Sequence, residues 1–383
     1  MNFRTFVDLL SKEGLLQRIS KLVDWKCELG DITRRSQSPM LFENIKDYPG
    51  MQVFSNGLGN LPSLSLALGL HTGNNWKSML MQARQRIGIP MKPVLVESGP
   101  VLENVVEASN IDLFKFPVPQ WSSCDAGRYI GTWHANVTCD PETGARNLGV
   151  YRMQVLSSNQ ATVSTSANSH LGRQFAKAEK QGRALAMAVV IGASEPVVMA
   201  AASAYPFGSD EYVLAGSLGG ESIRLIRCRT IDAEVPADSE IVIEGFLKPG
   251  VRVQDGPYFD YAGKPTTNPR AFVFEATGLM HRNNPILRGA AVGHHAAEDQ
   301  QLFSLLSDLN LFDFHNSRPR HHIESHLIRH RLFRAFQLAG RISVPSFLRN
   351  GIKQVAPISS CLWRRDASGN LSKSLVPHHA KKD

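Results

Sequence analysis

The sequence predicts an α/β (α+β) protein built from an N-terminal α/β domain and a central strand-rich domain. Short helix and strand patterns alternate over about the first 110 residues, which favours an α/β arrangement. Strand patterns with few helices between them then continue to about residue 300, which is typical of a barrel or sandwich of mixed topology. With 383 residues, 43% of them hydrophobic, the chain can bury a core in each part. We place the domain limits at 1–115, 116–300 and 301–383.

The first domain begins with an amphipathic helix. Phe3, Phe6, Val7 and Leu10 recur at helical spacing, and Gly14 ends the run. The patterns that follow predict helices at 31–35 and 63–70 and strands at 16–23, 39–43 and 51–54, the last two joined by a turn at Pro49-Gly50.

The central domain carries a hairpin signal, because strand patterns at 133–139 and 148–156 flank the turn residues 140–144. A helix is expected at 171–181. The remaining strand patterns lie at 161–166, 186–191, 223–231, 241–246 and 271–277. In the last part we expect a helix at 302–311 and a basic, weakly amphipathic segment at 330–338.

Composition and charge limit the function classes. The net charge of +8 is local, since the residues from 311 onward hold 13 Lys and Arg against 4 Asp and Glu, and the body is nearly neutral. A nucleic-acid-binding body is therefore not supported, and binding of nucleic acid through the basic tail ranks low. No apolar run is long enough for a membrane span, and the amphipathic pattern at the start does not predict a secretory leader. Five scattered cysteines without metal spacing favour a reducing, cytoplasmic compartment.

Asn147 and Arg152 are an amide and an arginine within the apolar, strand-rich segment that runs from Asn136 to Asp260. They are five positions apart, so a regular strand would turn them to opposite faces, and a bulge or bend is needed if both line one site. Arginine presents a planar fork of donors that suits a carboxylate or phosphate. The alternative is an arginine at a strand edge in water.

His170 and Glu211 each stand at an expected helix start, His170 just after its cap, Asn168 or Ser169. A helix N-terminus favours phosphate, and Mn²⁺ accepts carboxylate, amide oxygen and imidazole ligands. Both residues also allow a purely structural interpretation, in which His170 is a cap or surface residue and Glu211 stabilises the helix dipole.

Asp255 and Asp260 flank Gly256-Pro257, a turn signal that predicts exposed loop positions for both carboxylates. The functional interpretation pairs Arg152 with one carboxylate and leaves the other as a proton donor. The alternative is a solvated turn with no chemical role.

Six blocks in order, covering the chain to about residue 300, resemble the UbiD family of prenylated-FMN-dependent (de)carboxylases. They are Phe3–Leu10, Gly30–Arg35, Pro39–Lys46, Pro117–Trp121, Asn147–Arg152 and Asp232–Gly245. The resemblance implies an FMN-binding split β-barrel in the central domain, supported by the N-terminal α/β domain.

The resemblance also implies roles for single residues. Asn147, His170 and Glu211 match positions that hold a divalent metal, usually Mn²⁺, against the cofactor phosphate, and K⁺ commonly sits nearby. Arg152, Asp255 and Asp260 match the catalytic set, in which Arg152 orients the substrate carboxylate, Asp255 positions Arg152 and Asp260 donates a proton. The cofactor-binding residues implied are Asn147, Gly149, Val150, Tyr151, Arg152, Ser169, His170, Ser203 and Glu211.

The activity implied is non-oxidative decarboxylation of an aromatic, heteroaromatic or α,β-unsaturated carboxylic acid, with the reverse carboxylation left open. The cofactor carries the difficult chemistry and comes from a flavin prenyltransferase, while the protein positions the reactants. We expect a homo-oligomer, provided that the family's C-terminal segment is not required for assembly.

This sequence departs from the family pattern in two places. Asp255 replaces the usual Glu, and Phe259 stands where glycine is common, so we expect Phe259 to reshape the pocket or hinder the loop. After about residue 310 the family's C-terminal segment is missing or replaced by the basic tail. The alternative function is therefore a degenerate or truncated family member that acts as a non-catalytic subunit.

Overall fold

The computed structural model describes residues 1–70, 75–293, 297–316, 363–365 and 371–373. One compact unit comprises Met1–Ile323, and a second comprises Glu324–Asp383. In the second unit, β17 (Trp363–Arg365) pairs antiparallel with β18 (Leu371–Lys373). The expected basic segment at 330–338 lies outside the described residues. No helix of the described chain is long and apolar enough to cross a membrane.

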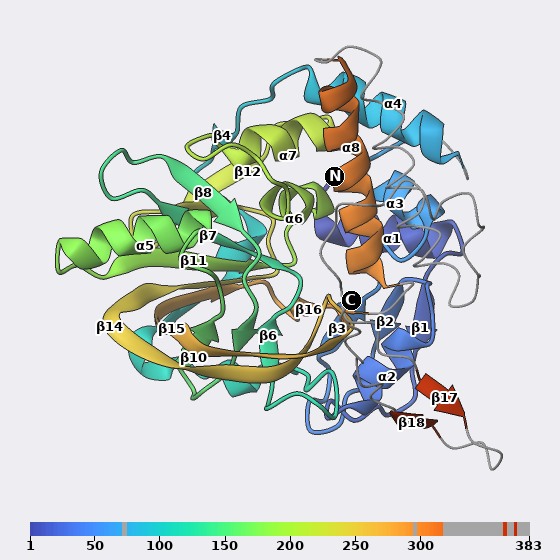
Figure 1. Cartoon of the computed structure of the whole chain (residues 1–383), viewed down its shortest axis with the longest axis horizontal. Helices are drawn as coiled ribbons and strands as arrows, with labels where there is room; N and C mark the ends of the chain where they lie inside the picture. Colours follow the sequence, from blue (N-terminus) through green and yellow to red (C-terminus); the bar gives the residue numbers. More distant parts are fainter. Residues whose placement is uncertain (71–74, 294–296, 317–362, 366–370, 374–383) are drawn as a thin grey trace, which may run out of the picture. The chain divides into compact units, whose positions relative to one another are not determined.

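The N-terminal part contains a four-stranded mixed sheet with helices around it (Figure 1). Its strand order is β1 (Gln17–Ile19), β2 (Met40–Phe42), β3 (Gln52–Ser55) and β16 (Ile286–Arg288). The hairpin of β2 and β3 confirms the predicted pair, whereas the first strand is shorter than expected. The helices are α1 (Phe3–Lys12), α2 (Glu28–Arg34), α3 (Leu61–Ala67) and α4 (Trp76–Ile87), the last of which the sequence patterns missed.

The central part is a curved seven-stranded sheet that is antiparallel at each pairing, so the expected mixed topology is wrong for this sheet. The order is β10 (Gln160–Val163), β15 (Lys264–His281), β14 (Ile241–Asp260), β11 (Leu185–Ile191), β7 (His134–Cys139) and β8 (Arg146–Gly149), with β5 (Asn104–Glu107) also on β15. Within the described chain no ladder joins β8 to β10, so the sheet stays open at that point.

The strands β14 and β15 are much longer than the sequence patterns predicted, at 20 and 18 residues. Gly256-Pro257 was interpreted as a turn, but β14 continues through it with a shift in register between Asp255 and Tyr258. The expectation that Asp255 and Asp260 occupy an exposed loop is therefore wrong. Both belong to β14, and Asp255 is fully buried.

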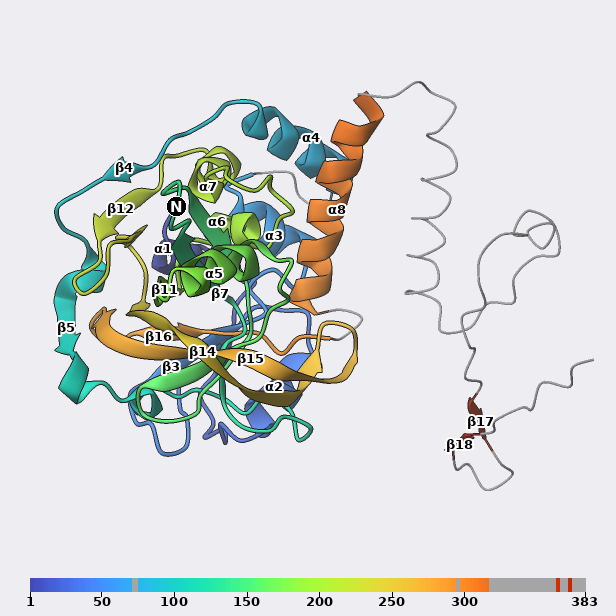
Figure 2. The same cartoon turned by 60° about the vertical axis from the view of Figure 1, so that its left-hand side comes forward.

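Smaller elements complete the unit (Figure 2). Two short sheets pair β4 (Val94–Leu95), β12 (Arg224–Arg227) and β13 (Glu234–Pro236), and β6 (Tyr129–Gly131) with β9 (Met153–Gln154). The helices are α5 (His170–Lys180), α6 (Glu195–Ala201), α7 (Glu211–Gly219) and α8 (Glu298–Asn316), and the short 3-10 turns span Pro100–Glu103, Ala108–Asn110 and Leu113–Lys115. The predicted helices at 171–181 and 302–311 are confirmed as α5 and α8.

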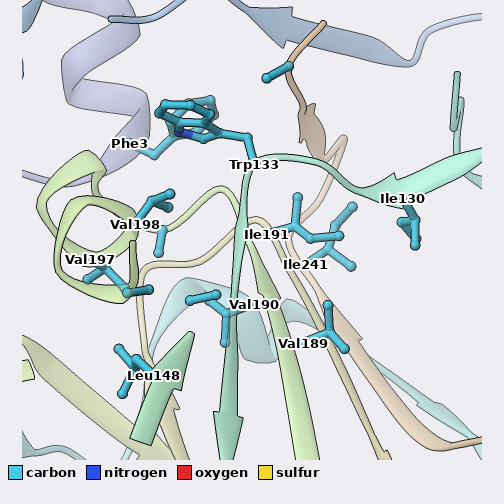
Figure 3. Packing of buried hydrophobic residues seen from close by; sticks show 14 of the residues in the cluster. Phe3, Ile130, Trp133, Leu148, Val189, Val190, Ile191, Val197, Val198 and Ile241 are labelled. Carbon is cyan, nitrogen blue, oxygen red and sulfur yellow. The ribbon is translucent and has the colours of Figure 1, made fainter. Parts of the chain in front are cut away.

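The core packs the apolar face of the central sheet against α6, as Figure 3 shows. Val190 on β11 and Leu148 on β8 lie near Val197 and Val198 of α6, and all four are buried. Burying such side chains contributes on the order of 1.5–3 kcal/mol each, so this layer fixes α6 and the strand β8 that leads into the site.

A buried ionic cluster joins β16 to two helices. Arg288 Nε donates to Glu195 Oε1 of α6 at 2.9 Å, and Arg288 Nη2 donates to Glu298 Oε2 of α8 at 2.5 Å. Trp133 Nε1 donates to the other oxygen of Glu195 at 2.8 Å, and Asn56 N donates to Glu298 at 2.9 Å. All three charged side chains are about 1% exposed, so each charge depends on these partners.

Replacing Arg288 with methionine should lower the free energy of unfolding by about 3–5 kcal/mol, because two buried carboxylates lose their counter-charge. The control is Arg18→Met, which removes an exposed ion pair with Glu43 and should cost less than about 1 kcal/mol. Urea unfolding of the three proteins measures the difference. Equal losses in both variants would contradict the prediction.

Candidate active site

Arg152 lies between the two carboxylates that the sequence analysis assigned to it. Its Nε donates to Asp255 Oδ1 at 2.6 Å, and its Nη1 donates to Asp260 Oδ2 at 2.8 Å. The Thr266 side chain on β15 accepts from Nη1 at 2.5 Å and donates to Asp260 Oδ2 at 2.7 Å. The structure therefore brings the three predicted catalytic residues together.

A bulge in β14 makes this arrangement geometrically feasible. Asp255 pairs with Asn268 and Tyr258 with Thr266, so β14 holds one more residue than β15 between these pairs. Side chains five apart on a regular strand point to opposite faces, and one extra residue returns both carboxylates to the same face.

The two carboxylates differ in exposure. Asp255 is fully buried, and its second oxygen accepts from the hydroxyl of Thr162 on β10 at 2.6 Å. The Asp260 side chain is 21% exposed and Arg152 is 12% exposed. Asp255 is thus fixed on both sides, whereas Asp260 and Arg152 keep part of their side-chain surface exposed.

A second group contains the predicted metal ligands, which come from three elements. Asn147 of β8 places Oδ1 at 3.0 Å from Nδ1 of His170, the first residue of α5. Glu211, the first residue of α7, places Oε1 at 3.9 Å from the same nitrogen. The other oxygen of Glu211 accepts from Leu148 N at 3.0 Å.

Burial disfavours charge in this second group. Desolvation raises the pKa of Glu211 to about 7, although the Leu148 amide opposes the shift. Desolvation, with the nearby Arg173, lowers the pKa of His170. Asn147 Nδ2 is buried and has no hydrogen-bond partner among the described residues. A cation bound by these carboxylate, amide and imidazole groups would offset the desolvation of Glu211, so the residues fit a divalent metal.

The remaining predicted cofactor-binding residues surround the break between β8 and β9. A side chain at Gly149 would meet the Tyr151 ring at about 2.4 Å, so glycine lets the two residues lie together. The Tyr151 hydroxyl accepts from Leu171 N at 3.4 Å, next to His170, and Val150 is half-buried. The expected bend between Asn147 and Arg152 is confirmed, because β8 ends at Gly149 and β9 starts at Met153.

Ser169 and Ser203 differ in their relation to the site. Ser169 is the N-cap of α5, where its oxygen accepts from Gly172 N at 2.9 Å. The Ser203 hydroxyl donates to Ala200 O at 2.7 Å instead of to the other predicted residues. It is Phe207, on the same loop, whose ring packs edge-on against His170 with centroids 5.1 Å apart.

Phe259 does not share the face of Asp260 on β14. A side chain at Gly293 would lie 2.9 Å from its ring, and the Arg34 guanidinium is 5.5 Å from the ring centroid. Strand alternation explains this direction, since neighbouring residues point to opposite faces. Phe259 therefore packs towards α2 and the segment after β16.

Sequence reasoning missed two buried residues that support the break at Tyr151. Asn136 Oδ1 accepts from Tyr151 N at 3.3 Å and lies 2.9 Å from His134 Nε2. Their alternation on β7 was the available signal, because both polar side chains fall on one face of an apolar strand. Burial lowers the pKa of His134 to about 4, so its imidazole is neutral at pH 7.

The buried His134 should make the folded protein lose stability in acid. Its folded pKa lies below the ordinary value of 6.5, so the unfolded chain binds the extra proton, and stability falls between about pH 6.5 and 4. The loss should reach on the order of 3 kcal/mol and shrink in His134→Gln. Urea unfolding at pH 7.5 and pH 4.5 tests this, and identical pH dependence of the two proteins would contradict it.

Family models match two parts of the chain. The N-terminal domain of 3-octaprenyl-4-hydroxybenzoate carboxy-lyase matches residues 7–80, and the Rift-related domain of the same enzyme matches residues 92–295. Among the described residues no group of three or more His, Cys, Asp or Glu could hold a metal ion. The predicted set includes an asparagine and only two residues of those types.

Two proteins with similar sequences agree with these family models. Pyrrole-2-carboxylic acid decarboxylase of Pseudomonas aeruginosa is 31% identical, over 82% of this chain and 66% of that protein. An uncharacterized protein of Synechocystis is 31% identical, over 79% of this chain and 64% of that protein. The chain thus spans about two thirds of the length of these relatives.

Two solved structures share the fold. An evolved dimeric form of the UbiD-class enzyme HmfF from Pelotomaculum thermopropionicum, in complex with prFMN, is 30% identical with a TM-score of 0.76, covering 82% of this chain and 72% of that one. Vanillic acid decarboxylase of Sedimentibacter hydroxybenzoicus, in closed form, is 27% identical with a TM-score of 0.78, covering 82% and 68%. On the strength of the matched models and these relatives, the chain belongs to the UbiD family of carboxy-lyases.

Proposed function

We propose that the protein catalyses the non-oxidative decarboxylation of an aromatic, heteroaromatic or α,β-unsaturated carboxylic acid with prenylated FMN as cofactor. The observation that carries this proposal is the arrangement of Arg152 between the buried Asp255 and the partly exposed Asp260. The names of the relatives support the reaction class, since they include decarboxylases of pyrrole-2-carboxylic acid and vanillic acid. The prFMN bound to HmfF supports the cofactor.

The exposure of Arg152, Asp255 and Asp260 indicates a different role for each in the reaction. Arg152 offers a fixed positive charge and its side chain is 12% exposed, so it would bind and orient the substrate carboxylate. Asp255, held by Thr162 and Arg152, would keep the guanidinium in place. Asp260 is the carboxyl that a ligand can reach, so it would deliver the proton to the product carbon after CO₂ has left.

The second group would hold the cofactor phosphate and its metal. Asn147, His170 and Glu211 supply oxygen and nitrogen ligands suited to Mn²⁺, and K⁺ is a candidate for a neighbouring position. The N-termini of α5 and α7 both lie here, and exposed amides at helix starts favour phosphate oxygens. When bound, prenylated FMN supplies the covalent activation of the unsaturated acid.

The proposal also covers the supply of the cofactor, the oligomeric state and the location of the protein in the cell. Prenylated FMN has to come from a flavin prenyltransferase, which we expect to be its supplier. A homo-oligomer in the cytoplasm remains our prediction for the assembly and its location. The competing function is a non-catalytic subunit of the family, which the activity measurements below separate from an enzyme.

Reconstitution with prenylated FMN and Mn²⁺ should give a protein that releases CO₂ from at least one acid in a panel of aromatic and α,β-unsaturated acids. Arg152→Lys keeps the charge but loses the fork of donors, so its kcat/KM should fall at least about a hundredfold. Asp260→Asn removes the proton donor and should lower kcat by about 10²–10⁴-fold.

The matched control is Arg252→Lys, which alters an arginine of β14 that pairs with Glu179 and stacks on Phe272 away from Arg152. Its activity should stay within about threefold of the wild type. A reconstituted protein without flavin absorbance would sink the proposal. Bound flavin without turnover would favour the non-catalytic subunit.

Glu211→Gln should reduce the Mn²⁺ and flavin retained after gel filtration by at least about tenfold, because a neutral amide replaces the only carboxylate of the second group. The control, Glu179→Gln, changes a carboxylate of α5 that binds Arg252 and should retain both ligands. Metal analysis and the flavin absorbance report the two contents. Full retention in Glu211→Gln would contradict the assigned metal site.

A further inference from the structure

Within the described residues, the later part of the strand that carries Asp260 has one edge that no other strand covers. The first part of β14 pairs with β11 only as far as Leu247, and the later part pairs only with β15. Phe259 lies opposite Pro265 of β15. Backbone amides and carbonyls of this part of β14 that point away from β15 need other partners.

The loop before β6 provides these partners. Asp125 Oδ1 accepts from Phe259 N at 2.8 Å, and Ala126 N donates to Pro257 O at 2.7 Å. The two bonds meet alternate residues of β14 along one edge, as a neighbouring strand would do. The Asp125 carboxylate thus replaces a backbone carbonyl at the position directly before Asp260.

Asp125 is itself fixed in place. Its second oxygen accepts from Ser122 N at 2.8 Å, and its side-chain position is 5% exposed. Burial raises the pKa of this carboxyl, while the Phe259 and Ser122 amides and Arg34 oppose that shift. Asp125, which accepts from two backbone amides, therefore lies next to the strand end that carries Asp260. The proposed mechanism gives it no role.

The same loop is attached to the N-terminal part. Arg34 Nη1, at the end of α2, donates to Trp121 O at 2.8 Å, and Cys27 N donates to Gln120 O at 2.8 Å. A side chain at Gly30 would overlap Trp121 O at 1.8 Å, so α2 packs directly on the loop. The loop before β6 is therefore bound to α2 and Cys27 on one side and to β14 on the other.

We propose that Asp125 is a positioning residue for the decarboxylation: by holding the Phe259 amide it keeps Asp260 on Arg152, where the proton is delivered. This inference rests on the proposed function. Asp125 does not touch the reacting atoms, and it acts through the backbone of β14. Loss of the bond lets the end of β14 move away from Arg152 while Asp255, before the bulge, stays fixed by Thr162.

Asp125→Asn tests the inference, because the amide can accept from only one of the two N–H groups. Its kcat should fall at least about tenfold with KM and flavin content unchanged within about twofold, since one hydrogen bond to a charged group is lost. Asp125→Glu, which keeps the charge but displaces the acceptor by one methylene, should fold and show the same selective loss. A loss of flavin content equal to the loss of kcat would show a merely structural role and overturn the inference.

The control variant is Asp140→Asn. Asp140 is also buried in a loop and accepts from two backbone amides, Glu142 N at 3.0 Å and Thr143 N at 3.2 Å, but it does not contact β14. Its kcat should equal that of the wild type. A tenfold loss of kcat in this control would show that removing any such buried loop carboxylate lowers kcat. That outcome would overturn the inference.

Two measurements without turnover separate the inference from the proposed function. Amide hydrogen exchange at Tyr258, Phe259 and Asp260 should be at least about tenfold faster in Asp125→Asn than in the wild type, and unchanged in Asp140→Asn. A crystal structure of Asp125→Asn should show Asp260 displaced from Arg152. If the wild type lacks decarboxylase activity, the proposed function fails, and an Arg152–Asp260 contact that persists in Asp125→Asn overturns the positioning role independently.

Discussion

Two carboxylates share one guanidinium in a largely buried volume, and the architecture around Arg152 follows from that ion cluster. An isolated buried charge is costly, so Asp255 is tied to Thr162 as well as to Arg152, and Asp260 shares its oxygen with Thr266. The bulge in β14 brings the carboxylates to one face, and β15 supplies the threonine opposite. Polar side chains on three strands thus make the charged cluster tolerable in the sheet.

The sequence indicated this site well where chemistry and spacing were local. The helix cap expected at Asn168 or Ser169, the hairpin at 140–144 and the bend between Asn147 and Arg152 all depend on neighbouring residues. The structure has the cap at Ser169 and contains the hairpin and the bend. The turn predicted at Gly256-Pro257 is wrong because the same residues that make a turn also permit a bulge in a strand. The direction of that choice depends on β15, which local sequence does not contain.

Contacts between distant segments were the part that sequence reasoning could not reach. Asn136 supports Tyr151 from a neighbouring strand, and Asp125 supports Phe259 from a loop more than a hundred residues earlier. Nothing in the composition of either segment names its partner, since both appear as ordinary polar residues. The assignment of the catalytic and metal residues stays a prediction, although the structure brings each set of three together.

The position of β16 has a consequence for how the chain is made. The N-terminal sheet obtains its last strand from residues 286–288, which pair parallel with β3, and Arg288 then closes the ion cluster with α6 and α8. During synthesis the first three strands leave the ribosome long before their fourth neighbour exists. The edge of β3 that pairs with β16 therefore has no partner strand until the central sheet has been synthesised. The two parts of the unit therefore complete their folding together rather than one after the other.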